Sequence, residues 1–237
     1  MSPSYKEMHL AALHVILALH KIGESWCCLV GGMAAKLHGV QRDRVKDLDI
    51  AVLRSGRSQA EIKRRLCKYD PEAFFLELPR RKNADFLLLK YEIREGCRIR
   101  IDLLLHNNPE AEIPPSLHWN HFEWISSMPV APLYFVLYHK LLGWEWRMGT
   151  GEGWRVHDAN NKDYEDIIQL CDLLRDQSIV PLSKSHLGRA YLKEFPRRAR
   201  LFANTYGEAR RRLYEIGFDV RSNEQSDSSY SSDDHWY

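Results

Sequence analysis

The stretch from Leu29 to Val52, L-V-G-G-M-A-A-K-L-H-G-V-Q-R-D-R-V-K-D-L-D-I-A-V, decides the fold of this chain. An apolar run ends at the glycine pair Gly31-Gly32, a short amphipathic segment ends at Gly39, and a second apolar run begins inside Asp47-Leu48-Asp49. This order predicts a strand, a glycine turn, a helix, a loop and a second strand.

Two kinds of ligand chemistry coincide in this stretch. Glycines at a strand-to-helix turn let the backbone approach a ligand, and the free N–H groups of the helix start favour an anion such as a phosphate. Asp47 and Asp49 are two residues apart, so on a strand both carboxylates point to one face, where hard oxygen ligands could hold Mg²⁺. The alternative is a tight turn followed by two solvated aspartates, which is the commoner origin of either half alone.

The complete pattern resembles the nucleotidyltransferase superfamily, which includes polymerase-beta-like enzymes and aminoglycoside nucleotidyltransferases. It is most similar to the minimal and abortive-infection-toxin-like branches, which share G-G-x-A, an H-G before the loop, an arginine and D-L-D-I. The resemblance implies an α/β fold with a small mixed sheet of about five strands flanked by helices, and a helical C-terminal part. It also implies that Gly31, Gly32 and Arg44 bind the nucleotide. Many members carry serine where this chain has Gly32, so a hydroxyl contact to the phosphates is not expected.

A third carboxylate follows on a later strand. In Arg98 to Leu105 the aliphatic residues alternate on one face, while Arg100 and Asp102 share the other. An acid in so apolar a strand is costly to bury unless it is paired or binds metal. In the resembled family such an acid completes a metal site, which implies that Asp47, Asp49 and Asp102 are the catalytic and metal-binding residues. The alternative is an ion pair of Asp102 with Arg100 or with another strand.

The helical C-terminal part carries a second, less specific pattern. The toxin-like nucleotidyltransferases have a lysine and an arginine on one helix and K-D-x-x-D on the next, and Lys140, Arg147, Lys162, Asp163 and Asp166 match this order. The resemblance implies that Lys140 neutralises triphosphate charge and that Asp163 orients the triphosphate or the metal shell.

Composition sets the limits of the chain. It has 237 residues, 44% of them hydrophobic, and a formal net charge of +2. No run approaches the roughly 20 apolar residues of a membrane span, and the N-terminus lacks the pattern of a signal peptide. The five cysteines contain no C-x-x-C spacing. We therefore expect an intracellular, cytoplasmic protein with reduced thiols and no membrane partner.

We predict three parts: an α/β core over 1–130, a helical part over 131–218 and a disordered acidic, Ser-rich tail over 219–237. The helical part should contain two last helices, broken at Pro196. Between Arg189 and Arg212, basic residues interleave with aromatic ones, which suits either an RNA-binding surface or a helical pair with a buried aromatic face. Trp119 and Trp124 are candidates for stacking a nucleobase, although core or rim packing is the commoner role of a tryptophan.

The function that the resemblance implies is transfer of a nucleoside monophosphate from an NTP to a hydroxyl acceptor in RNA, protein or a small molecule, with release of pyrophosphate. The expected cofactor is Mg²⁺, with Mn²⁺ as its substitute. The alternative is a catalytically weak or inactive protein of the same fold that binds nucleotide or RNA.

Overall fold

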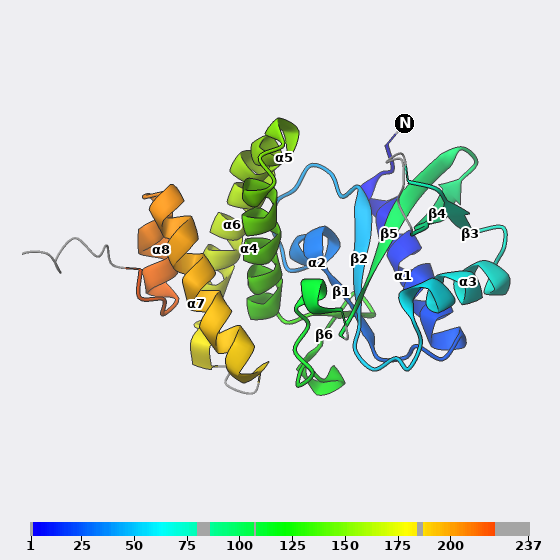
Figure 1. Ribbon diagram of the computed structural model, residues 1–237, viewed down its shortest axis with the longest axis horizontal. Coiled ribbons are helices and arrows are strands. Elements are labelled where there is room, and N and C mark those ends of the chain that lie inside the picture. Colours follow the sequence, from blue (N-terminus) through cyan, green and yellow to red (C-terminus); the bar gives the residue numbers. More distant parts are fainter. Residues whose placement is uncertain (1, 80–85, 107, 184–186, 221–237) are drawn as a thin grey trace, which may run out of the picture.

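The computed structural model describes residues 2–79, 86–106, 108–183 and 187–220 (Figure 1). One mixed sheet runs through the N-terminal half in the order β3-β4-β5-β2-β1-β7-β6. Its strands are β1 (Cys27–Val30), β2 (Asp47–Val52), β3 (Phe74–Glu77), β4 (Leu88–Arg94), β5 (Cys97–Leu105), β6 (Glu123–Ile125) and β7 (Met128–Val130).

Two neighbouring strands at the centre of the sheet carry the predicted acids. β2 is antiparallel to β1 and parallel to β5, and the parallel register places Asp47 beside Arg100 and Asp49 beside Asp102. Because paired residues of adjacent strands point to the same face, the three carboxylates share one face of the sheet.

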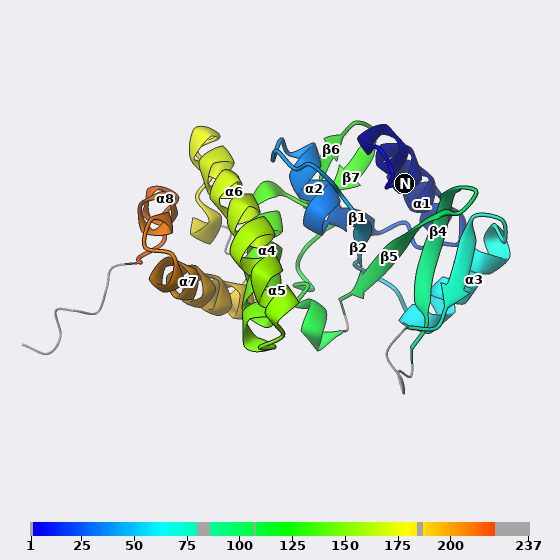
Figure 2. The same ribbon diagram turned by 90° about the horizontal axis from the view of Figure 1, so that it is seen from above.

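The opposite face of the sheet is covered by helices α1 (Tyr5–Lys21) and α3 (Gln59–Tyr69) (Figures 1 and 2). α1 begins with a capping box, in which the Ser4 and Glu7 side chains each accept a hydrogen bond from the other's backbone. His14 of α1 contacts the Tyr91 hydroxyl of β4 at 2.7 Å. Along β5 the aliphatic residues Ile99, Ile101, Leu103 and Leu105 are buried, whereas Arg100 and Asp102, on the other face, are at least partly exposed.

Within the described residues the sheet has seven strands, not about five as predicted, and the β6–β7 hairpin that follows β5 is part of the difference. Ser126 and Ser127 form its turn with positive φ values of 51° and 64°. Such a turn is usually signalled by Asn-Gly or Asp-Gly, so the Ser-Ser pair did not predict a hairpin. The hairpin joins the sheet where Val130 pairs with Leu29 of β1.

The C-terminal half is helical and faces the sheet across α2 (Gly31–Leu37) (Figure 1). It contains α4 (Leu133–Gly149), α5 (Gly153–Asp158), a π-helical turn (Ala159–Asp163), α6 (Tyr164–Asp176), α7 (Gly188–Thr205) and α8 (Ala209–Glu215). α4 is central because it packs against α2, α6 and α7.

The predicted break at Pro196 is wrong, because α7 continues through it to Thr205. Pro196 removes one backbone N–H from the helix. The buried side chains of Tyr191, Phe195 and Phe202 hold both halves of α7 on the same core. The chain turns after Tyr206 instead and begins α8 at Ala209.

The division into an α/β core and a helical part stays a prediction, with its boundary at the end of β7. Of the acidic tail predicted over 219–237, the structure describes only Asp219 and Val220, and Val220 is buried. The rest of that tail lies outside the described residues. In the described part of the chain, no helix is both long and apolar enough to cross a bilayer.

Candidate nucleotide and metal site

Gly31 makes room for the carboxylate of Asp49. Gly31 begins α2 with a φ of 59°, and a Cβ on it would lie 2.0 Å from the nearer Asp49 oxygen. Any other residue would meet both a strained backbone and a steric clash. The glycine turn and the first acidic strand are therefore in direct contact, as their joint occurrence in the sequence suggested.

A single arginine nitrogen bridges the other two carboxylates. Arg100 Nη2 lies 3.0 Å from Asp47 Oδ2 and 2.7 Å from Asp102 Oδ2. The ion pair that we considered as the alternative role of Asp102 is thus present, and it includes Asp47. As the side chains are placed, no group of His, Cys, Asp or Glu among the described residues is arranged to hold a metal ion.

The electrostatics of this cluster disfavour three negative charges. Burial, with Asp47 and Asp102 as neighbours, raises the pKa of Asp49 to about 7. Burial also raises the pKa of Asp102, against the opposing effect of Arg100. A cation entering the cluster would relieve this repulsion.

The carboxylates fit a hard divalent cation in chemistry but not in their present arrangement. Three carboxylates on adjacent strands offer only oxygen donors, which suits Mg²⁺ or Mn²⁺. Because Gly31 has no side chain, the Asp49 carboxylate has room beside the other two acids. Arg100, however, lies between two of the three acids and contacts one oxygen of each, where a metal shared by those two oxygens would lie.

A cavity of about 500 Å³ opens beside Asp49, between the acidic face of the sheet and α4. Gly31 and Asp49 form one wall, and Lys140 and Arg147 of α4 form another. The size is within the range of small-molecule sites. The cavity therefore places the first predicted motif opposite the second.

Two acids hold the cations of this second wall in place. Lys140 Nζ lies 2.7 Å from Asp166 and 3.9 Å from Asp163. Arg147 forms an ion pair with Asp163. Asp166 also pairs with Arg42 of the loop before β2, at 3.0 Å. Lys140 is buried, and its ion pairs make that burial tolerable.

The π-helical turn over Ala159–Asp163 positions these acids. It widens the helix directly before α6, so that Asp163 and Asp166 are both buried against α4. Turns of this kind are frequent at functional sites. Burial raises the pKa of Asp163, while Lys140 and Arg147 oppose that rise.

Comparison with known proteins supports this architecture through structure alone. The sequence matches no protein-family profile and no curated protein. The structure is similar to an antigenic nucleotidyltransferase-like protein from Paracoccidioides brasiliensis, with a TM-score of 0.60 at 14% identity over 91% of this chain and 95% of that one. The chain has a nucleotidyltransferase-like fold. A further similarity, to JHP933 from Helicobacter pylori, has a TM-score of 0.45 at 15% identity over 91% of this chain and 90% of that one.

Within this nucleotidyltransferase-like fold, the structure brings together most of the predicted site residues. Gly31, Asp49, Lys140 and Asp163 all line the cavity. Asp47 and Asp102 adjoin it through the register of β2 and β5. Arg44 is separate. It lines another depression, which it shares with Lys46 and Arg98 as well as with the N-terminal residues Ser2 and Pro3.

Arg42 is the arginine of this loop that reaches the site, and sequence reasoning missed it. Its Nη1 atom would lie 2.6 Å from a Cβ on Gly32, so its guanidinium fills the space beside the second glycine. Two arginines flank Asp43 in the loop, and their spacing does not indicate which one turns inward. Asp166 was recognised as part of the motif, but its role in holding Arg42 and Lys140 emerges only in three dimensions.

Trp146 is the tryptophan that lines the cavity of this fold. The residue is 58% exposed, and the Arg155 guanidinium lies over its ring, 4.4 Å from the ring centroid. The predicted candidates Trp119 and Trp124 are also exposed but lie elsewhere, with Trp119 packed edge-on against Trp26.

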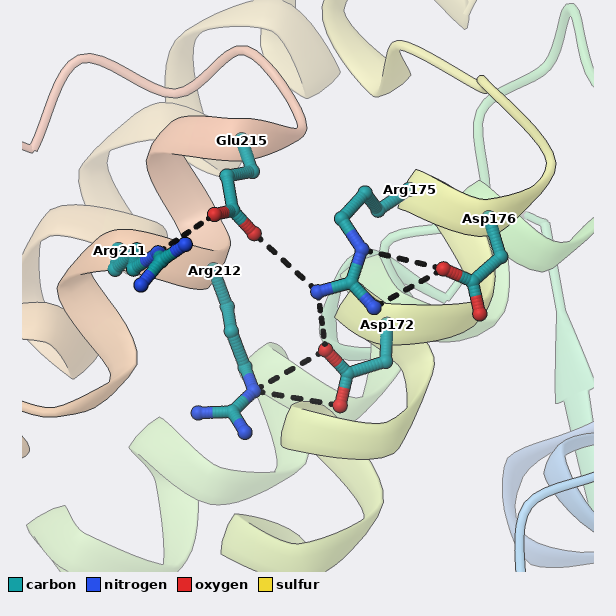
Figure 3. Close-up of polar contacts among 6 residues, drawn as sticks. All are labelled: Asp172, Arg175, Asp176, Arg211, Arg212 and Glu215. Atoms are coloured by element: carbon teal, nitrogen blue, oxygen red, sulfur yellow. Dashed lines mark hydrogen bonds and ion pairs between the residues drawn. The ribbon is translucent and has the colours of Figure 1, made fainter.

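The basic and aromatic segment of the last helices forms a helical pair, the second of the two interpretations. Figure 3 shows how α6 and α8 are joined by ion pairs: Asp172 accepts from Arg175 at 3.0 Å and from Arg212 at 3.2 Å. Glu215 pairs with Arg211 at 2.8 Å and with Arg175 at 3.3 Å. Of the basic residues between Arg189 and Arg212, Arg211 and Arg212 thus have acidic partners, and an RNA-binding role for this segment stays a prediction.

Proposed function

We propose that the protein transfers a nucleoside monophosphate from an NTP to a hydroxyl acceptor, with Mg²⁺ as cofactor and pyrophosphate as the second product. One observation carries the proposal: a cavity of about 500 Å³ is lined on one side by Asp49 and on the other by Lys140 and Arg147. One of the acids that suit a metal and the cations that suit a triphosphate thus face the same space.

The residues of the chain have separate tasks in this reaction. Lys140 and Arg147 would bind the triphosphate, and Asp163 and Asp166 would hold these cations in position. Asp102 would accept the proton of the acceptor hydroxyl as that oxygen attacks the α-phosphorus and the bond to pyrophosphate breaks. Mg²⁺, held by Asp47, Asp49 and Asp102, would supply charge stabilisation to the phosphoryl oxygens.

Trp146, which lines the cavity, suits the nucleobase. It follows Lys140 by nearly two turns of α4, so a nucleotide whose phosphates contact Lys140 could extend along the helix toward it. Its side chain is exposed, so a base could stack on the face of the ring that Arg155 does not cover, and such stacking accommodates any base.

The alternative, a nucleotide-binding protein of this fold with little or no catalysis, is favoured by one feature of the structure. Arg100 neutralises Asp47 and Asp102, the residues that would have to bind metal. If Arg100 stayed there permanently, the cavity could still bind a nucleotide through Lys140 and Arg147.

The test is to incubate the protein with each α-labelled NTP and Mg²⁺, together with total RNA or with protein, and to ask which macromolecule acquires label. Label that appears with the wild type and disappears with Asp102→Asn would support transfer. Nucleotide binding without any label in either fraction would support the binding protein, provided that small hydroxylated acceptors also remain unlabelled.

A further inference from the structure

We propose that Arg100 is a built-in competitor of the divalent cation: in the metal-free protein it closes the carboxylate site, and metal must displace it. The proposal rests on the function proposed above, because it concerns the metal which that reaction would use. It differs from that function in assigning a role to a residue that the reaction does not need.

The position of one atom carries the inference. Arg100 Nη2 contacts Oδ2 of Asp47 and Oδ2 of Asp102 at once, at 3.0 and 2.7 Å. A Mg²⁺ ion shared by the same two oxygens would lie about 2.1 Å from each. The nitrogen and the ion would overlap, so they exclude each other.

The fold brings this arginine to the acids by register. Arg100 is the direct β-partner of Asp47 on the parallel strand, and it precedes Asp102 by two residues on its own strand. All three side chains therefore leave the sheet on the same face. The ladder fixes the backbone of Arg100, but its side chain is 43% exposed and has room to turn away.

Among the described residues, Arg100 is the one cation that forms ion pairs with Asp47 and Asp102. Lys63 acts on Asp102 only through its charge, since its Nζ donates to the carbonyl of Leu87 at 2.7 Å. Lys140 is paired with Asp166 across the cavity. Removing Arg100 should therefore leave the carboxylates open to metal.

The chain offers a matched control two residues away. Arg98 lies on the same strand and, two residues before Arg100, on the same face, and it is 40% exposed. Its partners are Glu77 and Glu92, not the site acids. Arg98→Gln thus removes the same charge from the same surface without touching the site, and it isolates the effect of contact from that of overall charge.

The experiment is a calorimetric titration with Mn²⁺ alone, without nucleotide, of the wild type, Arg100→Gln and Arg98→Gln, with circular dichroism to confirm folding. We expect Arg100→Gln to bind Mn²⁺ about tenfold more tightly than the wild type, because a competing cation is gone, and Arg98→Gln to change affinity by less than about twofold. Arg100→Lys, with a shorter reach and a single nitrogen, should fall between them.

Unchanged or weaker Mn²⁺ binding by Arg100→Gln would overturn the proposal, as would an equal gain in Arg98→Gln. If Arg100→Gln does not fold, Arg100→Lys decides, and an affinity equal to that of the wild type overturns it. Tighter binding by Arg100→Gln without any nucleotide transfer would refute the proposed reaction and leave the role of Arg100 intact. Failure of every variant to bind Mn²⁺ would overturn both.

Discussion

Replacing Asp49 with Asn should stabilise the metal-free protein at alkaline pH. The pKa of Asp49 rises from 3.8 to about 7, chiefly through burial and then through Asp47 and Asp102. A shift of about 3 units corresponds to about 4 kcal/mol. Ionised Asp49 therefore lowers the free energy of unfolding by at most this amount.

The sign of the pH dependence follows from proton binding. Between pH 3.8 and about 7 the folded protein binds more protons at Asp49 than the unfolded chain does, so this residue makes stability fall as pH rises, until about pH 7. The asparagine side chain of the variant would carry no charge in either state. The variant should therefore match the wild type near pH 4 and exceed it by about 2–4 kcal/mol near pH 8.5.

Urea unfolding at several pH values, with a chelator present, measures this difference. Asp43→Asn is the control, because Asp43 is an exposed acid in the loop before β2, and its loss should change stability by less than about 0.5 kcal/mol. Mg²⁺ with NTP should then stabilise the wild type more than Asp49→Asn. A variant that is less stable than the wild type at pH 8.5 would refute the reasoning, since it would mean that Asp49 is held by a favourable ion pair.

Three other outcomes test the site and its frame. Gly31→Ala should destabilise the protein by more than about 2 kcal/mol, because the added Cβ would lie 2.0 Å from an Asp49 oxygen and the residue has a positive φ. Gly56→Ala is the control, because a Cβ at that position would have no atom within 4 Å, and thermal melting compares the two variants. Lys140→Ala should weaken NTP binding about tenfold in a titration, whereas Lys162→Ala, which removes an exposed lysine paired with Asp158, should not. Equal NTP affinities of Lys140→Ala and the wild type would exclude Lys140 from the site. Arg198→Ala should cost about 3–5 kcal/mol in unfolding experiments, because the buried guanidinium pairs with Glu112 and Glu145; a loss below about 1 kcal/mol would show that these acids remain hydrated.

The part of the fold predicted from sequence is the part with strong local signals. The glycine pair and D-L-D between two apolar runs located β1, α2 and β2, and the alternation in β5 placed Arg100 and Asp102 on one face, as the structure has them. The β6–β7 hairpin was missed because Ser126 and Ser127 adopt positive φ values without the usual Asn or Gly. The break at Pro196 was predicted from a local rule that the packing of α7 overrides.

The contacts of the site were less predictable than its members. Lys140 was expected from the resemblance to neutralise triphosphate charge, and the sequence did not indicate that the structure buries it between Asp163 and Asp166. The burial of this side chain depends on α6, which follows α4 only after α5 and the π-helical turn. Helical periodicity describes one helix and does not show which face a later helix will cover.

Gly32 shows how one departure from the resembled family is consistent with the rest of the site. A serine at this position would need a Cβ 2.6 Å from Arg42 Nη1, so the serine and the present position of Arg42 exclude each other. Arg42 is held there by Asp166, which also holds Lys140 on the wall of the cavity. The space that a serine side chain would occupy thus holds the Arg42 guanidinium, and Asp166 links this group to Lys140. Glycine at this position therefore does not by itself argue for an inactive protein, because the space beside it holds the charged guanidinium of Arg42.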